Sequence, residues 1–191
     1  LIQEENTDEE TLDELSQGLK IIKRRSHHLT SFVDTYRRLA ELPLPQKKEE
    51  DLTIIIKNTI LLFEQELTQK NIKTNFLIED SFKINVDKKQ IEQIIINLIS
   101  NCIYAIQNEI DPLIKINITQ DKQRTHLSIT DNGIGISKKI KDNVFIPYFT
   151  TRKDGSGIGL TLSKSIIEAH NGTIQFISKK GETTFTLTFI N

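Results

Sequence analysis

A glycine-rich segment that begins at Gly155 has the composition of a phosphate-binding loop. Its glycines follow the spacing Gly-x-Gly-x-Gly, and the segment leads straight into a predicted helix. Backbone N–H groups and the positive end of the helix dipole would then converge on an anion. The segment lacks the Lys-Ser/Thr pair of a P-loop and the glycine spacing of a dinucleotide motif. The candidate phosphate-contacting residues are Gly155, Ser156, Gly157, Ile158, Gly159 and Leu160.

The segment before this loop combines aromatic side chains with cations. Phe149 is followed within four residues by Thr151, Arg152 and Lys153. Because adjacent cations neutralise phosphate charge, we interpret the segment as a flap that closes over a triphosphate. The alternative is a surface loop anchored by Phe145 and Phe149.

A second glycine-containing segment follows a predicted strand that ends at Thr130. Asp131 stands at the end of this strand, and Gly133 and Gly135 permit positive φ and close backbone approach. A carboxylate there can accept a hydrogen bond from an exocyclic amine, such as the amino group of adenine. Because Asp-Asn-Gly is also a common turn sequence, the alternative is a turn closed by the aspartate side chain.

Two asparagines interrupt an otherwise apolar helix. Asn97 and Asn101 lie four residues apart and therefore share one face, with Gln93 and Tyr104 along the same stripe. An amide oxygen is a hard ligand for Mg²⁺, which gives the pair a functional interpretation. The alternative is that this face is simply solvated, and the helix alone leaves both interpretations open.

A long amphipathic helix is predicted ahead of these segments, from Leu12 to Ala40. Its apolar residues recur at spacings of three and four, the pattern of a bundle or coiled coil, and such a stripe favours self-association. The alternative is packing onto its own domain. Proline at positions 43 and 45 ends the helix, so we predict one domain over residues 1–45 and a second over residues 46–191, joined by a solvated linker at 46–51.

The second domain alternates helical and strand patterns. Apolar periodicity predicts helices over residues 52–68, 88–108 and 160–169. Alternation predicts strands over 82–86, 114–118, 127–129, 173–177 and 183–190, with a hairpin turn near Asp121. This order predicts an α+β fold, a two-layer α/β sandwich with helices on one face of a mixed, mostly antiparallel sheet.

The composition excludes several classes of protein. Lys and Arg number 25 against 26 Asp and Glu, a formal net charge of -1, which argues against nucleic acid as a partner. The single cysteine, Cys102, has apolar neighbours, so we expect a buried thiol without a structural role in a disulfide or metal cluster. We expect no membrane-spanning helix, and the lack of any methionine suggests a piece of a longer chain.

Taken in order, the motifs resemble those of the protein histidine kinases of the GHKL ATPase superfamily. Asn97-x-x-x-Asn101 is similar to their N box and Asp131-x-Gly133-x-Gly135 to their G1 box. Phe145-x-Pro147-x-Phe149 is similar to the F box, Gly155-x-Gly157-x-Gly159 to the G2 box, and Thr183-Thr184-Phe185 to the final Thr-Thr-Phe motif.

The resemblance implies a role for each motif in binding Mg-ATP. By position, Asp131 would contact adenine, Asn101 would coordinate Mg²⁺ and Asn97 would support the site. The glycines of the G2 box would line the triphosphate, and Arg152 or Lys153 would neutralise its charge. The remaining residues expected to bind the nucleotide are Gly133, Gly135, Thr151, Ser156, Ile158, Leu160 and Thr184.

The resemblance also implies what this chain would lack. In the family the γ-phosphoryl group of ATP passes to a histidine on a first dimerisation helix and then to an aspartate of a response regulator receiver domain. The N-terminal helix here looks like the second helix of that dimerisation domain, and His27 and His28 do not form the acceptor motif. We therefore expect a homodimer through this helix that binds Mg-ATP without phosphorylating itself.

Many relatives are sensors anchored in the bacterial inner membrane, and the resemblance implies a cytoplasmic location for this domain within such a parent. Two alternative functions stay open from the sequence. One is a dimerising scaffold that binds nucleotide without catalysis, and the other is a serine kinase or ATPase of the same superfamily.

Overall fold

The computed structural model describes residues 15–23, 26, 30, 33, 42–76, 80–152 and 155–190. The chain divides into two compact units, Leu1–Glu41 and Leu42–Asn191, which we describe separately. The predicted division into domains over residues 1–45 and 46–191 stays a prediction.

The described residues of the first unit are all α-helical. The predicted helix is thus confirmed wherever the structure describes residues between Leu15 and Val33. The side chains of Leu15, Leu19, Ile22 and Val33 are more than half exposed. These are the residues of the predicted apolar stripe. His27, His28 and the predicted end of the helix at Ala40 lie outside the described residues.

The second unit carries the predicted helices and strands. In chain order its elements are β1 (Lys48–Asp51), α2 (Leu52–Leu61), α3 (Glu64–Gln69), β2 (Lys73–Phe76), β3 (Lys83–Val86), α4 (Lys88–Ala105), β4 (Leu113–Gln120), β5 (Arg124–Asp131), the 3-10 helix η1 (Lys141–Asn143), α5 (Gly159–Ala169), β6 (Thr173–Lys179) and β7 (Glu182–Ile190).

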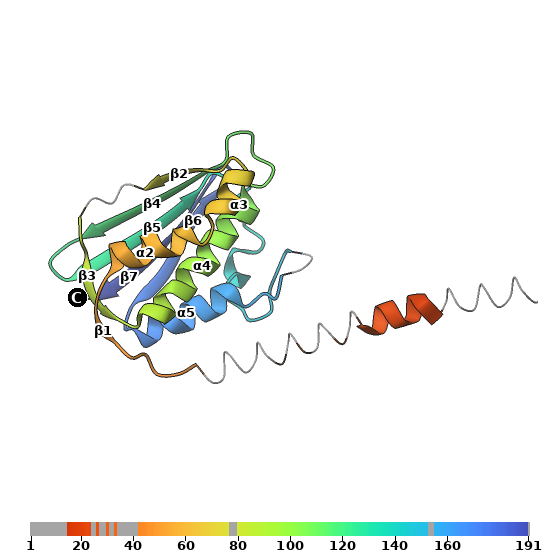
Figure 1. The fold of residues 1–191 in the computed structure, drawn as a ribbon, viewed down its shortest axis with the longest axis horizontal. Helices are drawn as coiled ribbons and strands as arrows, with labels where there is room; N and C mark the ends of the chain where they lie inside the picture. Colours follow the sequence, from red (N-terminus) through yellow and green to blue (C-terminus); the bar gives the residue numbers. More distant parts are fainter. Residues whose placement is uncertain are drawn as a thin grey trace, which may run out of the picture. The chain divides into compact units, whose positions relative to one another are not determined.

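The described strands form a two-layer arrangement with the helices. Within the described residues, one sheet has the order β2-β4-β5-β7-β6, in which β2 pairs parallel with β4 and the other neighbours pair antiparallel. A second, two-stranded sheet pairs β1 with β3. Helices α2, α4 and α5 lie over one face of the larger sheet (Figure 1). The predicted fold class is therefore confirmed.

The core lies between α4 and the sheet. Ile91, Ile95 and Leu98 of α4 are fully buried, as is Leu127 of β5. On β7 the buried Phe185, Leu187 and Phe189 alternate with threonines that face away from the helices. The helical spacing of isoleucine along α4 therefore fixes which of its faces packs on the sheet, and the asparagines fall beside that face.

Replacing Leu98 with alanine is expected to lower the free energy of unfolding by about 2–5 kcal/mol, because the cavity cannot fill in a fully packed core. Leu98 is 0% exposed, whereas Leu61 at the end of α2 is 61% exposed. Urea unfolding followed by circular dichroism measures the difference. Leu61→Ala is the matched control, and equal losses for the two variants would contradict this placement of the core.

Two predicted segments differ in kind from the structure. Residues 48–51, predicted as linker, form β1 and pair with Lys83–Val86. The strand is polar because its side chains are exposed or only partly buried, so no apolar alternation marks it. The helix predicted over 52–68 is divided at Leu62 and Phe63, whose N–H groups bond to the third residue before them and tighten the chain into a turn.

The strand β2 was missed by the sequence analysis. Its first three residues are exposed and only Phe76 is partly buried, so the segment has no apolar alternation. It forms the parallel edge of the sheet because Lys73–Phe76 pairs with Leu113–Ile116 of β4. Tertiary pairing, not local sequence, sets this strand.

The chain enters the second unit through hydrogen bonds to the start of α4. The side chain of Gln90 donates to the carbonyl of Pro43 at 2.9 Å, and the N–H of Gln46 donates to Asp87 Oδ2 at 2.9 Å. The other oxygen of Asp87 caps α4 by accepting from the N–H of Lys89 at 3.0 Å. One carboxylate therefore both starts α4 and fixes the incoming chain.

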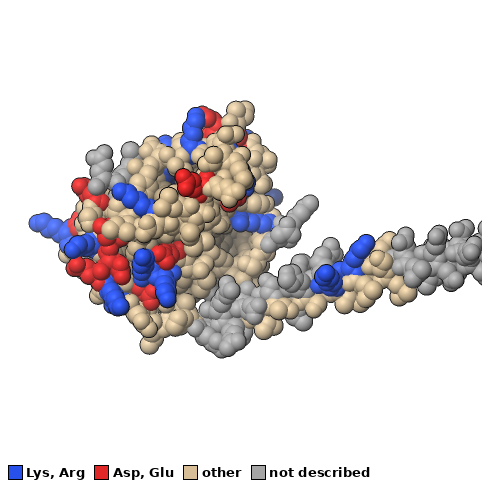
Figure 2. Space-filling view, viewed as in Figure 1, with Lys and Arg blue, Asp and Glu red and all other residues tan. Residues whose placement is uncertain are grey.

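Charges of both signs share the surface of this unit that is turned to the viewer in Figure 2. Among the exposed ion pairs of this unit are those of Lys83 with Glu49 at 3.3 Å and of Lys88 with Glu92 at 3.9 Å. Exposed pairs of this kind add little stability. On the face shown, the described basic residues are interspersed with acidic ones.

Candidate functional site

The polar side chains of α4 and the glycine-rich loop meet at one cavity of about 290 Å³. Its walls come from α4, the end of β5, the segments before α5, the start of α5, and β7. The predicted site residues that line it are Asn97, Asn101, Asp131, Gly135, Thr151, Arg152, Gly155, Ser156, Gly157, Ile158, Gly159 and Leu160. Segments far apart in the sequence thus form one pocket, while Lys153 lies outside the described residues.

Asn97 joins α4 to the start of α5. Its Nδ2 donates to the carbonyl of Gly159 at 3.1 Å and to Ser163 Oγ at 3.3 Å. Its Oδ1 accepts from the side chain of Gln93 at 3.4 Å. The solvated-face alternative therefore fails for Asn97, because its amide positions the glycine-rich loop against α4.

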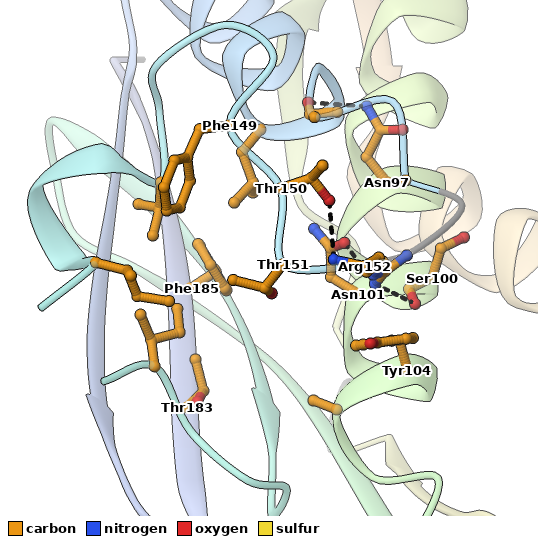
Figure 3. Close-up of a pocket in the computed structure, with 18 of the residues that line it drawn as sticks. Asn97, Ser100, Asn101, Tyr104, Phe149, Thr150, Thr151, Arg152, Thr183 and Phe185 are labelled. Atoms are coloured by element: carbon orange, nitrogen blue, oxygen red, sulfur yellow. Dashed lines mark hydrogen bonds between the residues drawn. The ribbon is translucent and has the colours of Figure 1, made fainter. Parts of the chain in front are cut away.

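Asn101 lies one turn further along α4 and contacts Arg152. The guanidinium Nη2 of Arg152 donates to Asn101 Oδ1 at 2.8 Å and to the carbonyl of Ser100 at 3.0 Å (Figure 3). The guanidinium carbon lies 4.2 Å from the ring centroid of Tyr104. Burial lowers the pKa of Arg152, although guanidinium groups stay charged in proteins. The predicted flap thus contacts α4 through one cation.

Asp131 forms the polar floor of the pocket. Its side chain is 3% exposed, and its Oδ1 accepts from the N–H of Gly133 at 2.9 Å. Burial raises the pKa of Asp131 to about 6, although the hydrogen bond from Gly133 acts in the opposite direction. The predicted turn closed by the aspartate side chain is therefore present. The same carboxylate also lines the pocket.

Gly133 and Gly135 are required by close backbone contacts. A Cβ at Gly133 would lie 2.4 Å from the carbonyl oxygen of Ala105, and one at Gly135 would lie 2.5 Å from the carbonyl oxygen of Lys179. Gly135 also has a φ of 75°, which favours glycine. Gly133 does not line the cavity; it packs this segment against the end of α4.

The glycine-rich loop presents the start of α5 to the cavity. Helix α5 begins at Gly159, one residue before the predicted start, and Ile158 caps it without a side-chain hydrogen bond. The first N–H groups of a helix lack intrahelical partners and attract anions. Among the described residues, no capping side chain competes with a phosphate for this helix start.

The model of the histidine kinase-, DNA gyrase B- and HSP90-like ATPase family matches residues 86–190, which is more than half of the chain. The chain belongs to this ATPase family. The matched residues run from the end of β3 through β7 and contain every wall of the cavity. The residues of the pocket are therefore those of an ATPase domain.

Relatives and solved structures place this ATPase domain among the sensor histidine kinases. Sensor histidine kinase ZraS of Escherichia coli (strain K12) is 30% identical over 176 residues, which cover 91% of this chain and 37% of that protein. The catalytic domain of histidine kinase ThkA superposes with a TM-score of 0.69 and 29% identity, covering 76% of this chain and 95% of that one.

A longer structure extends the likeness. Histidine kinase ThkA in complex with response regulator protein TrrA superposes with a TM-score of 0.73 and 25% identity, covering 89% of this chain and 49% of that chain. This chain therefore spans about half or less of the longer relatives it matches. In fold and sequence, residues 86–190 are thus an ATPase domain similar to the catalytic domains of sensor histidine kinases.

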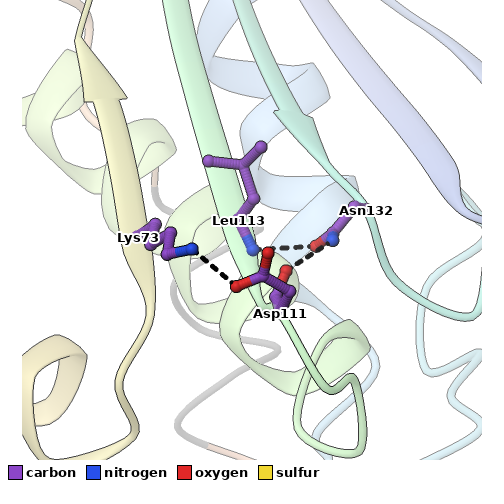
Figure 4. Close-up of polar contacts among 4 residues, drawn as sticks. All are labelled: Lys73, Asp111, Leu113 and Asn132. Atoms are coloured by element: carbon purple, nitrogen blue, oxygen red, sulfur yellow. Dashed lines mark hydrogen bonds and ion pairs between the residues drawn. The ribbon is translucent and has the colours of Figure 1, made fainter.

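Asn132 holds the aspartate segment of the ATPase domain in place. Its Oδ1 accepts from the N–H of Leu113 at 2.8 Å, and its Nδ2 donates to the carbonyl of Asp111 at 2.8 Å (Figure 4). Lys73 in turn donates to the carboxylate of Asp111 at 2.7 Å. The role of Asn132 was not predicted, because its partners come from other elements that no local sequence pattern links to it.

One predicted site residue of the ATPase domain faces away from the pocket. Thr184 lies on the sheet face opposite the helices, where its hydroxyl is 2.9 Å from that of Thr130. Its neighbours Thr183 and Phe185 line the cavity instead. Because side chains alternate along β7, a shift of one residue moves the contact to the other face of the sheet.

Cys102 is buried, as predicted, with 1% of its surface exposed. Burial raises the pKa of its thiol, and the nearby Asp131 raises it further. Among the described residues, no group of three or more His, Cys, Asp or Glu side chains could hold a metal ion. The same part of the chain contains no helix with the length and hydropathy of a membrane span.

Proposed function

We propose that the chain binds Mg-ATP in this cavity and supplies the nucleotide half of a histidine autokinase. The observation that supports this is the convergence of three unlike groups on one pocket. These are the carboxylate of Asp131, the amide oxygen of Asn101 and the uncapped start of α5. They suit an exocyclic amine, a hard cation and a phosphate chain respectively.

The residues of the pocket would divide the work of binding. Asp131 would accept a hydrogen bond from the amino group of adenine, and the loop Gly155–Leu160 would surround the triphosphate. Asn101 would hold Mg²⁺, which neutralises phosphate charge when bound. Asn97 would keep the loop in position through Gly159. Arg152, with Lys153 and Thr151 beside it in the sequence, would contact the phosphates.

The phosphoryl acceptor would come from elsewhere. Phosphoryl transfer depends mainly on positioning and charge neutralisation, so this chain needs only to present the γ-phosphoryl group to an imidazole. We propose that the acceptor lies on a first dimerisation helix that pairs with the helix of residues 1–45 in a homodimer. A response regulator receiver domain would then accept the phosphoryl group. The parent protein would be anchored in the inner membrane.

Calorimetric titration with a non-hydrolysable ATP analogue, with and without Mg²⁺, tests the first step. We expect binding in both conditions and tighter binding with Mg²⁺. Binding in neither condition would contradict the proposed nucleotide site. Separately produced dimerisation helices that carry an acceptor histidine should then gain acid-labile phosphate from ATP. Acid-stable phosphate would favour a serine kinase, and acid-labile phosphate on the chain alone would contradict the external acceptor.

The affinity for ATP is expected to fall as the pH drops below about 6, by up to about tenfold per pH unit. Only the carboxylate form of Asp131 accepts from the adenine amine, and its pKa of about 6 means that protons then compete with the ligand. Calorimetry across this range measures the slope. Asp131→Asn is the control, because any pH dependence of ATP affinity that this variant retains comes from titration of the nucleotide. The same pH dependence in the variant and the wild type would contradict the role of Asp131.

A further inference from the structure

Arg152 is held by α4 at three points. Its Nη2 donates both to Asn101 Oδ1 at 2.8 Å and to the carbonyl of Ser100 at 3.0 Å, and its guanidinium lies over the ring of Tyr104. The N–H of Arg152 donates to Thr150 Oγ1 at 3.0 Å, which fixes the backbone at the base of the side chain. Figure 3 shows the guanidinium between Asn101 and Tyr104.

The described partners of this cation are electrically neutral. They are an amide oxygen, a backbone carbonyl and an aromatic face, and no described ion pair includes Arg152. Guanidinium groups bind phosphate through shorter and stronger charge-assisted hydrogen bonds than they make with neutral oxygens. A triphosphate in the same pocket therefore offers Arg152 alternative partners, to which it can move when Mg²⁺ displaces it from Asn101.

The oxygen that Arg152 occupies is the one proposed to hold the metal. A guanidinium hydrogen bond and a Mg²⁺ ion would both place positive charge at Asn101 Oδ1, and two cations at one oxygen repel each other. Arg152 in this position therefore opposes ligation of Mg²⁺ by Asn101.

We propose that Tyr104 is a positioning residue that keeps Arg152 on Asn101, so that Mg²⁺ and Arg152 compete for one amide oxygen. This inference rests on the proposed function. Because the ring of Tyr104 stabilises the guanidinium only while it lies against α4, the ring weakens Mg²⁺ binding. Tyr104 thereby sets the Mg²⁺ concentration at which the nucleotide complex forms.

A Mg²⁺ titration at saturating non-hydrolysable ATP analogue tests this role in the purified chain. Tyr104→Leu removes the aromatic face and is expected to lower the Mg²⁺ midpoint by about three- to thirtyfold, the range of a cation–π contact. Tyr104→Phe keeps the face and should keep the midpoint. The affinity for the analogue without Mg²⁺ should change less than the midpoint, whereas a merely structural role would weaken both measurements together.

Tyrosine fluorescence gives an independent readout, because the chain has no tryptophan and three tyrosines. In a Tyr36→Phe/Tyr148→Phe background, the emission of Tyr104 should change when Mg²⁺ is added to the analogue complex and Arg152 leaves the ring. An unchanged midpoint in Tyr104→Leu, or unchanged emission, would overturn this inference while leaving the proposed function intact. No binding of the analogue to the wild-type chain would overturn both.

Discussion

Replacing Asp131 with asparagine is expected to weaken ATP binding by about ten- to a hundredfold, the range of a hydrogen bond to a charged group. A carboxylate has two acceptor oxygens, and Oδ1 already accepts from the N–H of Gly133. Asparagine has one acceptor oxygen. If that oxygen stays with Gly133, the amide NH₂ faces the adenine amine, so a donor opposes a donor.

The same replacement is expected to preserve or raise stability at neutral pH. Burial raises the pKa of Asp131 from 3.8 to about 6, so its protonated form favours folding. This stabilisation is complete below the unfolded pKa and is lost as the pH rises through 6. A shift of this size corresponds to at most about 3 kcal/mol. The neutral amide avoids that cost of burying a charge.

Two measurements separate the effects of Asp131→Asn. Calorimetry measures its affinity for ATP, and urea unfolding at two pH values measures its stability. The variant should bind ATP poorly and yet unfold at the same or higher urea concentration than the wild type at neutral pH. Loss of both affinity and stability would mean that Asp131 serves only to close its turn. Unchanged affinity would remove Asp131 from the nucleotide site.

Replacing Gly157 with alanine is expected to weaken ATP binding by at least about tenfold, because local strain and a displaced loop cost about 1–3 kcal/mol or more. Gly157 has a φ of 69°, and a Cβ there would lie 2.5 Å from the backbone carbon of Tyr148. Two backbone segments collide at this point, so neither can move aside by rotating a side chain. The loop that would surround the triphosphate must shift instead.

Gly181→Ala is the matched control for this substitution. Gly181 has a φ of 81°, and a Cβ added there would have no atom within 4 Å. Alanine at position 181 therefore introduces the strain of a positive φ without a collision of its Cβ. Gly181 lies in the turn between β6 and β7. We expect Gly181→Ala to lose stability and keep its affinity for ATP. Equal losses of affinity in the two variants would contradict the role given to the loop.

The sequence predicted those elements whose burial is decided by their own side chains. Helix α4 was predicted because Ile91, Ile95 and Leu98 repeat with the helical period and all become buried. Strand β7 was predicted because its apolar and threonine residues alternate. Strands β1 and β2 were missed because their residues are mostly exposed, and their pairing depends on partners elsewhere in the chain.

The sequence predicted most of the residues that line the site, but not the hydrogen bonds between them. The spacing of Asn97 and Asn101 places both on one face of a helix, but nothing local indicates that Asn101 meets Arg152, 51 residues away. The same limit applies to Asn132 and its partner Leu113. In β7 the motif identified the right segment, and the alternation of the strand decided that Thr183 lines the pocket in place of Thr184.

The hydrogen bonds of Pro43 and Gln46 to the start of α4 would also be the first to bear a mechanical load on this end of the ATPase domain. A pull on the chain at Leu42 would act on Gln90 and Asp87. An α-helix is a stiff rod with a rise of about 1.5 Å per residue, so Asn97 lies roughly 15 Å along it from Asp87. A displacement of residues 43–46 would thus act directly on the helix that carries both asparagines of the pocket.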